Sequence, residues 1–110
     1  MASERAERIA ENESIFRLAN ERMAKWEERQ RADARELYFC ECGNAECREK
    51  VELVKADYER ARSDSSTFFV VPGHEIRDLE AVIEQREDWV LVRKSPEVRE
   101  QVESSDPRRD

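Results

Sequence analysis

Three cysteines stand within eight residues near the middle of the chain, as Cys40, Cys42 and Cys47. The only histidine, His74, follows later in the sequence. Three thiolates and one imidazole make a complete tetrahedral shell for Zn²⁺ of the closed, structural kind. Soft thiolate ligands favour zinc or an iron–sulfur centre over Mg²⁺ or Ca²⁺. The sequence therefore predicts one zinc ion held by Cys40, Cys42, Cys47 and His74.

The C-x-C-x4-C spacing sets a geometric condition on this site. Side chains at i and i+2 of a straight strand are about 6.5–7 Å apart, whereas sulfurs around tetrahedral zinc approach to about 3.8 Å. The chain must therefore curl into a knuckle after Cys40. Gly43 and Asn44 favour this curl because both tolerate positive φ.

Other interpretations of the same residues stay open. The cysteines could be free thiols in a core, an iron–sulfur centre, or a redox pair whose oxidation would eject a metal. If His74 is an ordinary turn residue, Glu41, Glu75 or water would complete the shell. A zinc hydrolase would need an open position and a general base, for which Glu75 is the candidate. No nucleophile elbow or glycine-rich phosphate loop is present, so a non-enzymatic role is favoured over catalysis.

Short strands must position the ligands. A strand over 37–39 leads into Cys40, and a continuous apolar strand over 67–71 ends at Pro72-Gly73 and presents His74. We expect the second strand to lie in the middle of a sheet and to pair with the first. Further predictions are a strand over 51–53, a helix over 55–62 and, as the preferred interpretation, a β-hairpin over 80–94, although 79–85 also suits a helix. The fold class is α+β, with a long N-terminal helix and a small mixed or antiparallel sheet that carries a zinc-stapled knuckle.

Residues 4–34 contain no Gly or Pro and predict one long helix, capped by Ser3. Two heptad-like rows run along it: Ile9, Phe16, Met23 and Gln30, and Asn12, Ala19, Trp26 and Asp33, flanked by Ile15, Leu18 and Arg22. This amphipathic helix either packs on its own domain or forms a seam for a second copy or a partner helix, and Trp26 is the aromatic residue expected in an interface.

The whole chain has 110 residues, which fits three consecutive regions. These are an N-terminal helix (1–35), a small α+β zinc-binding domain (36–95) and a polar, disordered tail (96–110). Charged residues make up 43% of the chain and the net charge is −7, with the acidic excess in residues 36–110. An acidic surface repels phosphate backbones, so nucleic acid is a disfavoured partner.

No stretch approaches the roughly 20 apolar residues of a membrane span, and the N-terminus lacks an apolar secretory segment. Three cysteines are an odd number for a disulfide framework. We therefore expect a cytoplasmic protein with reduced thiols and no membrane association.

Several of these residues also carry a family resemblance. They are Tyr38-Phe39-Cys40-Glu41-Cys42-Gly43, then Cys47, Asp57-Tyr58-Glu59-Arg60-x-Arg62, Phe69 and Pro72-Gly73-His74-Glu75. The pattern resembles an uncharacterised family of short actinobacterial proteins with an F-x-C-E-C…C motif, a Y-E-x-x-R helix and a P-G-H-E turn. The resemblance extends to about Lys94 and implies that the cysteines and His74 act as one unit; it implies no activity.

Taken together, the sequence predicts a small zinc-binding adaptor or regulatory protein that acts through protein–protein contacts. The partner would be another protein, or a second copy bound through the N-terminal helix. The alternatives are a thiol-based redox or zinc sensor and, more distantly, a zinc-dependent hydrolase.

Overall fold

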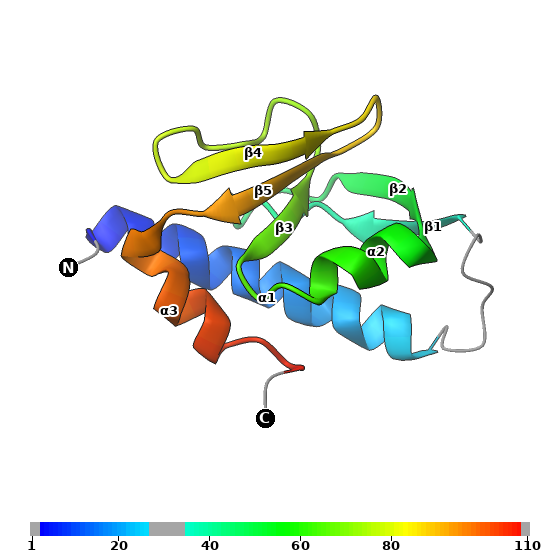
Figure 1. The fold of residues 1–110 in the computed structure, drawn as a ribbon, viewed down its shortest axis with the longest axis horizontal. Helices are drawn as coiled ribbons and strands as arrows, with labels where there is room; N and C mark the ends of the chain where they lie inside the picture. The colour runs from blue at the N-terminus through cyan, green and yellow to red at the C-terminus, as the bar shows by residue number, and fades with distance from the viewer. Residues whose placement is uncertain (1–2, 27–34, 109–110) are drawn as a thin grey trace.

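A computed structural model describes residues 3–26 and 35–108, without the side chains of 24–26. The elements are α1 (Glu4–Trp26), β1 (Arg35–Phe39), β2 (Lys50–Val54), α2 (Lys55–Arg62), β3 (Thr67–Val70), β4 (Glu80–Gln85), β5 (Val90–Lys94) and α3 (Pro96–Ser104). The α+β class is confirmed, because a long N-terminal helix accompanies small antiparallel sheets (Figure 1).

The strands form two sheets, β1-β2 and β3-β5-β4, in which every pair is antiparallel. The prediction that β3 is a central strand paired with β1 is wrong, since β5 lies in the middle of the larger sheet and β3 at its edge. A backbone hydrogen bond of 2.7 Å from Glu41 N–H to Phe69 O links the sheets just after β1 ends. The predicted hairpin over 80–94 is confirmed by the β4-β5 pairing.

Strand β3 is almost entirely apolar because both of its own faces are buried. Phe68 and Val70 join the core cluster that contains residues of α1 and α3. Phe69 joins a second cluster with Tyr58 of α2 and Tyr38 of β1. Burial on two faces removes the polar alternation that marks a half-exposed strand.

Helix α1 begins as predicted, with Ser3 Oγ accepting a hydrogen bond of 3.0 Å from Ala6 N–H. The continuation to residue 34, with Gln30, Asp33 and the Trp26 side chain, lies outside the described residues. The predicted rows are not the main buried face, because Ile9, Asn12, Phe16, Ala19 and Met23 are only half-buried.

The buried face of α1 consists of Ala6, Ala10, Glu13, Arg17, Asn20 and Glu21. Its polar members have buried partners. Arg17, for example, donates to Ser65 O and Val102 O at 2.5 and 2.6 Å. Hydropathy alone therefore pointed to the wrong face, because hydrogen-bonded and paired polar groups can be buried.

The region from residue 96 was predicted to be a disordered tail with at most a helical turn after Pro96, whereas it begins with the two-turn helix α3. Pro96 occupies the first turn, where its missing N–H leaves no bond unmade. Val98 and Val102 are buried in the core cluster beside α1. Two valines spaced four residues apart were too weak a pattern to outweigh the polar composition.

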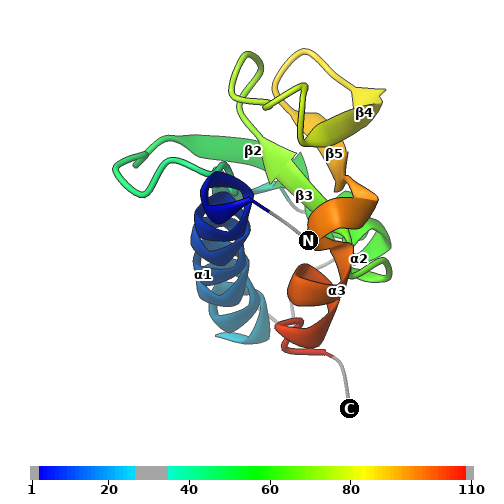
Figure 2. The ribbon, with the colours of Figure 1, turned by 90° about the vertical axis from the view of Figure 1, so that its left-hand side faces the viewer.

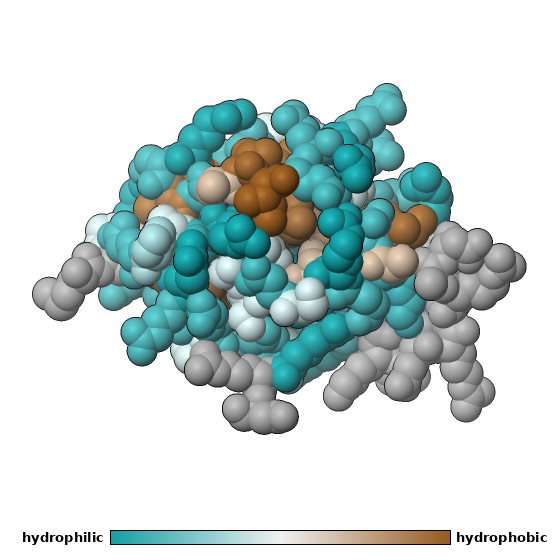
Figure 3. Space-filling view, in the orientation of Figure 1, coloured by the Kyte–Doolittle hydropathy of each residue, from teal (hydrophilic) through white to brown (hydrophobic). Residues whose placement is uncertain are grey.

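The surface in view is mostly hydrophilic, with apolar side chains gathered over the strands of the larger sheet (Figure 3). Val82 and Ile83 of the edge strand β4 are among the exposed apolar residues. Among the described helices, none combines the length and apolar character needed to cross a bilayer.

Candidate metal centre

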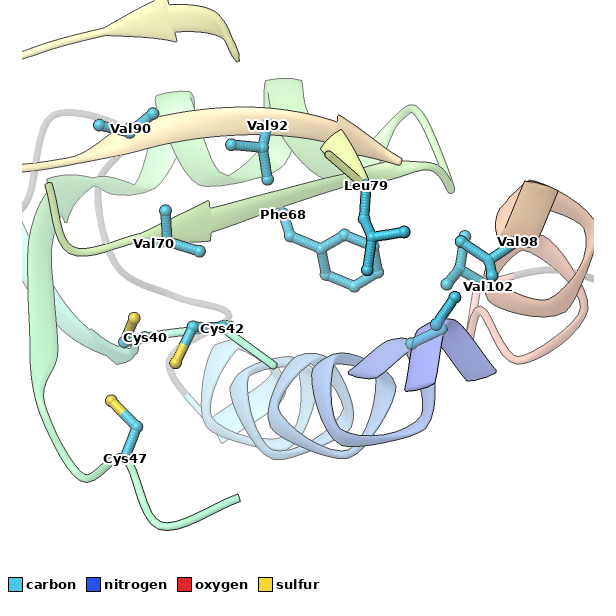
Figure 4. Close-up of a cluster of buried hydrophobic side chains, with 12 residues drawn as sticks. Cys40, Cys42, Cys47, Phe68, Val70, Leu79, Val90, Val92, Val98 and Val102 are labelled. Carbon is cyan, nitrogen blue, oxygen red and sulfur yellow. The ribbon is translucent and has the colours of Figure 1, made fainter. Parts of the chain in front are cut away.

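The four residues predicted as ligands converge. The sulfur atoms of Cys40, Cys42 and Cys47 and a ring nitrogen of His74 all lie within 4.8 Å of one another. The Nδ1 atom of His74 is 3.5 Å from Cys40 Sγ and 3.8 Å from Cys47 Sγ. The cysteines are buried together at one end of the core cluster, with α3 at the other end (Figure 4).

Backbone hydrogen bonds within residues 40–49 shape the knuckle that holds the three cysteines. Cys40 N–H donates to Glu49 O at 3.0 Å, and Cys47 N–H donates to Asn44 O at the same distance. The Asn44 side chain accepts a further bond of 2.9 Å from Glu46 N–H. The connection between β1 and β2 thereby folds back on itself, so Cys47 returns to the two cysteines that follow β1.

Gly43 has a role other than the predicted one. The only positive-φ glycine in the described part of the chain is Gly73. A Cβ atom on Gly43 would lie closer to Ile9 Cγ2 than real Cβ atoms approach. Asn12 Nδ2 also donates to Gly43 O at 3.0 Å. Gly43 therefore allows α1 to pack directly against the knuckle.

The turn after β3 delivers His74 and contributes a hydrogen bond to the sulfurs. Gly73 takes φ 95°, which any other residue adopts with strain. His74 N–H donates to Val71 O at 2.9 Å. Val71 N–H donates to Cys40 Sγ at 3.2 Å, a contact that stabilises a thiolate.

Glu49 orients the histidine ring. Its Oε2 atom is 2.9 Å from His74 Nε2, on the ring edge opposite the sulfurs. A histidine that binds a metal usually directs its other nitrogen to a carboxylate or carbonyl. Sequence reasoning missed Glu49, since one acidic residue in a chain with 27 of them carries no distinguishing signal.

Glu41, between two cysteines, points into a buried polar network instead of toward the sulfurs. Arg62 donates to its two oxygens at 2.7 and 2.8 Å. Asn20 Nδ2 and Phe69 N–H add bonds of 2.7 and 3.0 Å. Alternation along the chain explains this, because Cys40 and Cys42 face one side and the residue between them faces the other. Glu41 is thus a support for the knuckle.

The other carboxylate proposed as a fourth ligand is also engaged elsewhere. Glu75 Oε1 accepts a bond of 2.8 Å from Gly73 N–H, and Glu75 Oε2 lies 3.3 Å from Arg77 Nη2. Neither Glu41 nor Glu75 belongs to the convergent group, whereas His74 does.

The thiols ionise unequally. A hydrogen bond from Cys40 lowers the pKa of Cys42 to about 5. The same bond, together with burial, raises the pKa of Cys40, and burial raises that of Cys47. One thiolate forms readily, but three adjacent thiolates in a buried cluster require a cation to balance them.

The donor set fits a tetrahedral metal ion. Sulfur ligands around zinc lie about 3.8 Å apart, given the Zn–S distance of about 2.3 Å. The atoms here, within 4.8 Å, need only a small contraction to reach that separation. No family model, curated protein or solved structure matches the chain. The resemblance to a cysteine-containing family stays a prediction, and the chemistry rests on the site itself.

Proposed function

We propose that the protein binds one zinc ion through Cys40, Cys42, Cys47 and His74 and acts as a small non-enzymatic adaptor or regulatory protein. The observation that carries this proposal is the convergence of four zinc-type donor atoms within 4.8 Å. Zinc, when bound, would cross-link the segment after β1, the β1-β2 connection and the turn after β3. The free energy of metal binding would thereby add to the free energy of folding.

A structural site is favoured over a hydrolytic one. Four protein donors fill a tetrahedral shell and leave no position for water. The candidate base, Glu75, is held by Gly73 N–H and lies beside Arg77. A zinc-dependent hydrolase therefore remains only a distant alternative.

A second candidate function, a thiol-based redox or zinc sensor, is favoured by the closeness of the sulfurs. A peroxide could oxidise two thiolates to a disulfide and be reduced to water, which would remove two ligands and release the metal.

Contacts with other proteins, or with a second copy through α1, would carry the adaptor role. We propose a cytoplasmic location, a proposal supported by three free cysteines that suit a reducing compartment.

The test is elemental analysis of protein purified under reducing conditions. We expect one zinc per chain, and loss of zinc together with a lower melting temperature in Cys40→Ser and His74→Ala. Glu46→Ala, an exposed change in the same connection, should retain zinc. Folded wild-type protein without bound metal would refute the proposal. Metal that survives mild peroxide, with all thiols still titratable, would exclude the sensor alternative.

A further inference from the structure

Helix α1 has a second regular face, which lies opposite the buried one. Its residues are exposed and spaced alternately by three and four positions: Arg8, Glu11, Ile15, Leu18 and Arg22. We call this set the outer stripe. Spacing of this kind places side chains in one seam along a helix. Figure 2 views the molecule along α1 and shows α2 and α3 on one side of the helix, with its opposite side turned away from them.

The centre of the outer stripe is apolar. Ile15 and Leu18 are 59% and 39% exposed, and they are neighbours at i and i+3 on the helix. Isolated exposed apolar residues need no explanation, but these two have charged residues on both sides within the same seam. The half-buried row predicted as a dimer seam cannot serve this purpose, because Ile9 and Met23 pack against the molecule's own core clusters.

The charges that flank this centre are self-complementary in one arrangement. Glu11 lies four residues before Ile15, and Arg22 lies four residues after Leu18. When two copies of α1 cross antiparallel about a two-fold axis midway between Ile15 and Leu18, each Ile15 meets the partner's Leu18. In the same register each Glu11 meets the partner's Arg22, so the symmetry produces two ion pairs around four apolar side chains. In-register parallel pairing would instead oppose like charges.

Neither charge is engaged within the described part of its own chain. Other charged side chains form ion pairs, such as Arg5 with Asp78, but within the described residues Glu11 and Arg22 form none. They are roughly 16 Å apart along one helix, at about 1.5 Å per residue, so they cannot pair with each other within one molecule.

We infer that the outer stripe of α1 is a homodimer interface in which two copies pair antiparallel with Glu11 against the partner's Arg22. This inference rests on the proposed function in one respect, since it names a second copy of the chain as the protein that the adaptor contacts. It does not depend on the metal. An interface with two apolar side chains per copy is small, so a weak, concentration-dependent dimer is expected.

A charge-exchange series tests the register. The molar mass of the full-length protein, purified in the presence of zinc, is measured by analytical ultracentrifugation from about 10 µM to about 1 mM, a range suited to weak interfaces. We expect a dimer whose dissociation constant rises about tenfold in Glu11→Lys and in Arg22→Glu, because each introduces two like-charge contacts. The double variant should return to the wild-type constant, since its charges are complementary again. Glu87→Lys, an exposed change in the β4-β5 turn, is the control for net charge.

Each outcome bears on the inference. Monomers at every concentration would overturn it, as would a dimer in which the double variant shows no recovery. The inference is established if the wild-type protein dimerises, the separate variant Ile15→Gln does not, and the charge-exchanged double variant regains the wild-type dissociation constant. Zinc content is measured in the same samples. Monomers with one zinc per chain would contradict only the interface, while dimers without zinc would contradict only the metal site.

Discussion

Glu41 is a fully buried carboxylate flanked by two cysteines, and its neutralisation depends on Arg62. Both side chains are at most 1% exposed. Removing one member of a buried ion pair leaves an uncompensated charge, which typically costs about 3–5 kcal/mol. Such a pair need not add to stability overall, but it specifies how the knuckle sits on α1 and α2.

We therefore expect Glu41→Gln to lower the free energy of unfolding by about 3–5 kcal/mol, because the Arg62 charge then lacks its counter-ion. The measurement is urea unfolding of zinc-loaded protein at neutral pH. Glu52→Gln, an exposed change on β2, should leave stability close to wild type. Equal stability of the two variants would show that the buried pair does not support the knuckle.

Glu49 permits a separate prediction about the ligand atom of His74. With Nε2 directed to Glu49, the metal should bind Nδ1. Long-range ¹H–¹⁵N spectra should show this directly, because the chain has a single histidine. Loss of an outer carboxylate partner typically lowers metal affinity about 10–100-fold. Glu49→Ala should therefore weaken zinc in competition with a chelator, whereas Glu46→Ala should not. Binding through Nε2 would contradict this geometry.

At the scale of elements, α1 docks on the larger sheet through a buried charged cluster. Lys94 Nζ of β5 lies 2.7 Å from Glu13 Oε1 of α1 and 3.1 Å from Glu80 Oε2 of β4. All three side chains are at most 1% exposed. Burial chiefly raises the pKa of Glu13 well above 4.5, and the neighbouring Glu80 raises it further. When Glu13 carries a proton, the cluster contains one neutral carboxyl group, the Glu80 carboxylate and the Lys94 ammonium, so its net charge is zero.

The docking of α1 should therefore depend on pH. The folded-state pKa of Glu13 is above its unfolded value, so its contribution to stability is fully present below pH 4.5 and is lost as pH rises through the folded pKa. Glu13→Gln imitates the protonated carboxyl. From about pH 5 to about pH 8 the variant should gain stability relative to wild type, by at most about 1.4 kcal/mol per pH unit.

Unfolding by urea across this pH range measures the difference. Glu100→Gln, on the exposed side of α3, should run parallel to wild type. If the curves for Glu13→Gln and wild type were also parallel, Glu13 would be ionised in the folded protein and the cluster would carry a net charge.

Elements differed in how well the sequence predicted them. The helix over 55–62 and the hairpin over 80–94 were predictable because their patterns are local. The placement of β3 at a sheet edge was not, since pairing is decided by what covers each face. The convergence of the three cysteines with His74 was predictable from residue type alone, whereas Glu41 and Glu49 acquire their roles only from partners distant in sequence. The buried face of α1 was missed for the same reason.

At the scale of the whole molecule, the candidate metal centre lies where the two sheets meet. Cys40 and Cys42 follow β1, Cys47 lies in the β1-β2 connection, and His74 follows β3 of the other sheet. The Glu41–Phe69 backbone bond and the Arg62 network also connect these parts. A metal ion bound there would tie the smaller sheet to the larger one, whereas the β4-β5 hairpin pairs within its own sheet.

Removal of zinc should accordingly loosen the molecule unevenly. A ligand at 1,000 times its dissociation constant stabilises the folded state by about 4.1 kcal/mol. At about 4 °C or more per kcal/mol for a domain near this size, chelation should lower the melting temperature by roughly 15 °C. Hydrogen exchange should accelerate first in residues 40–50 and 71–76, and later or not at all in 80–94. His74→Ala should already exchange in this way and respond little to chelator. Uniform acceleration along the chain would mean that the metal stabilises one cooperative unit, and unchanged exchange would mean that the two sheets hold together without it.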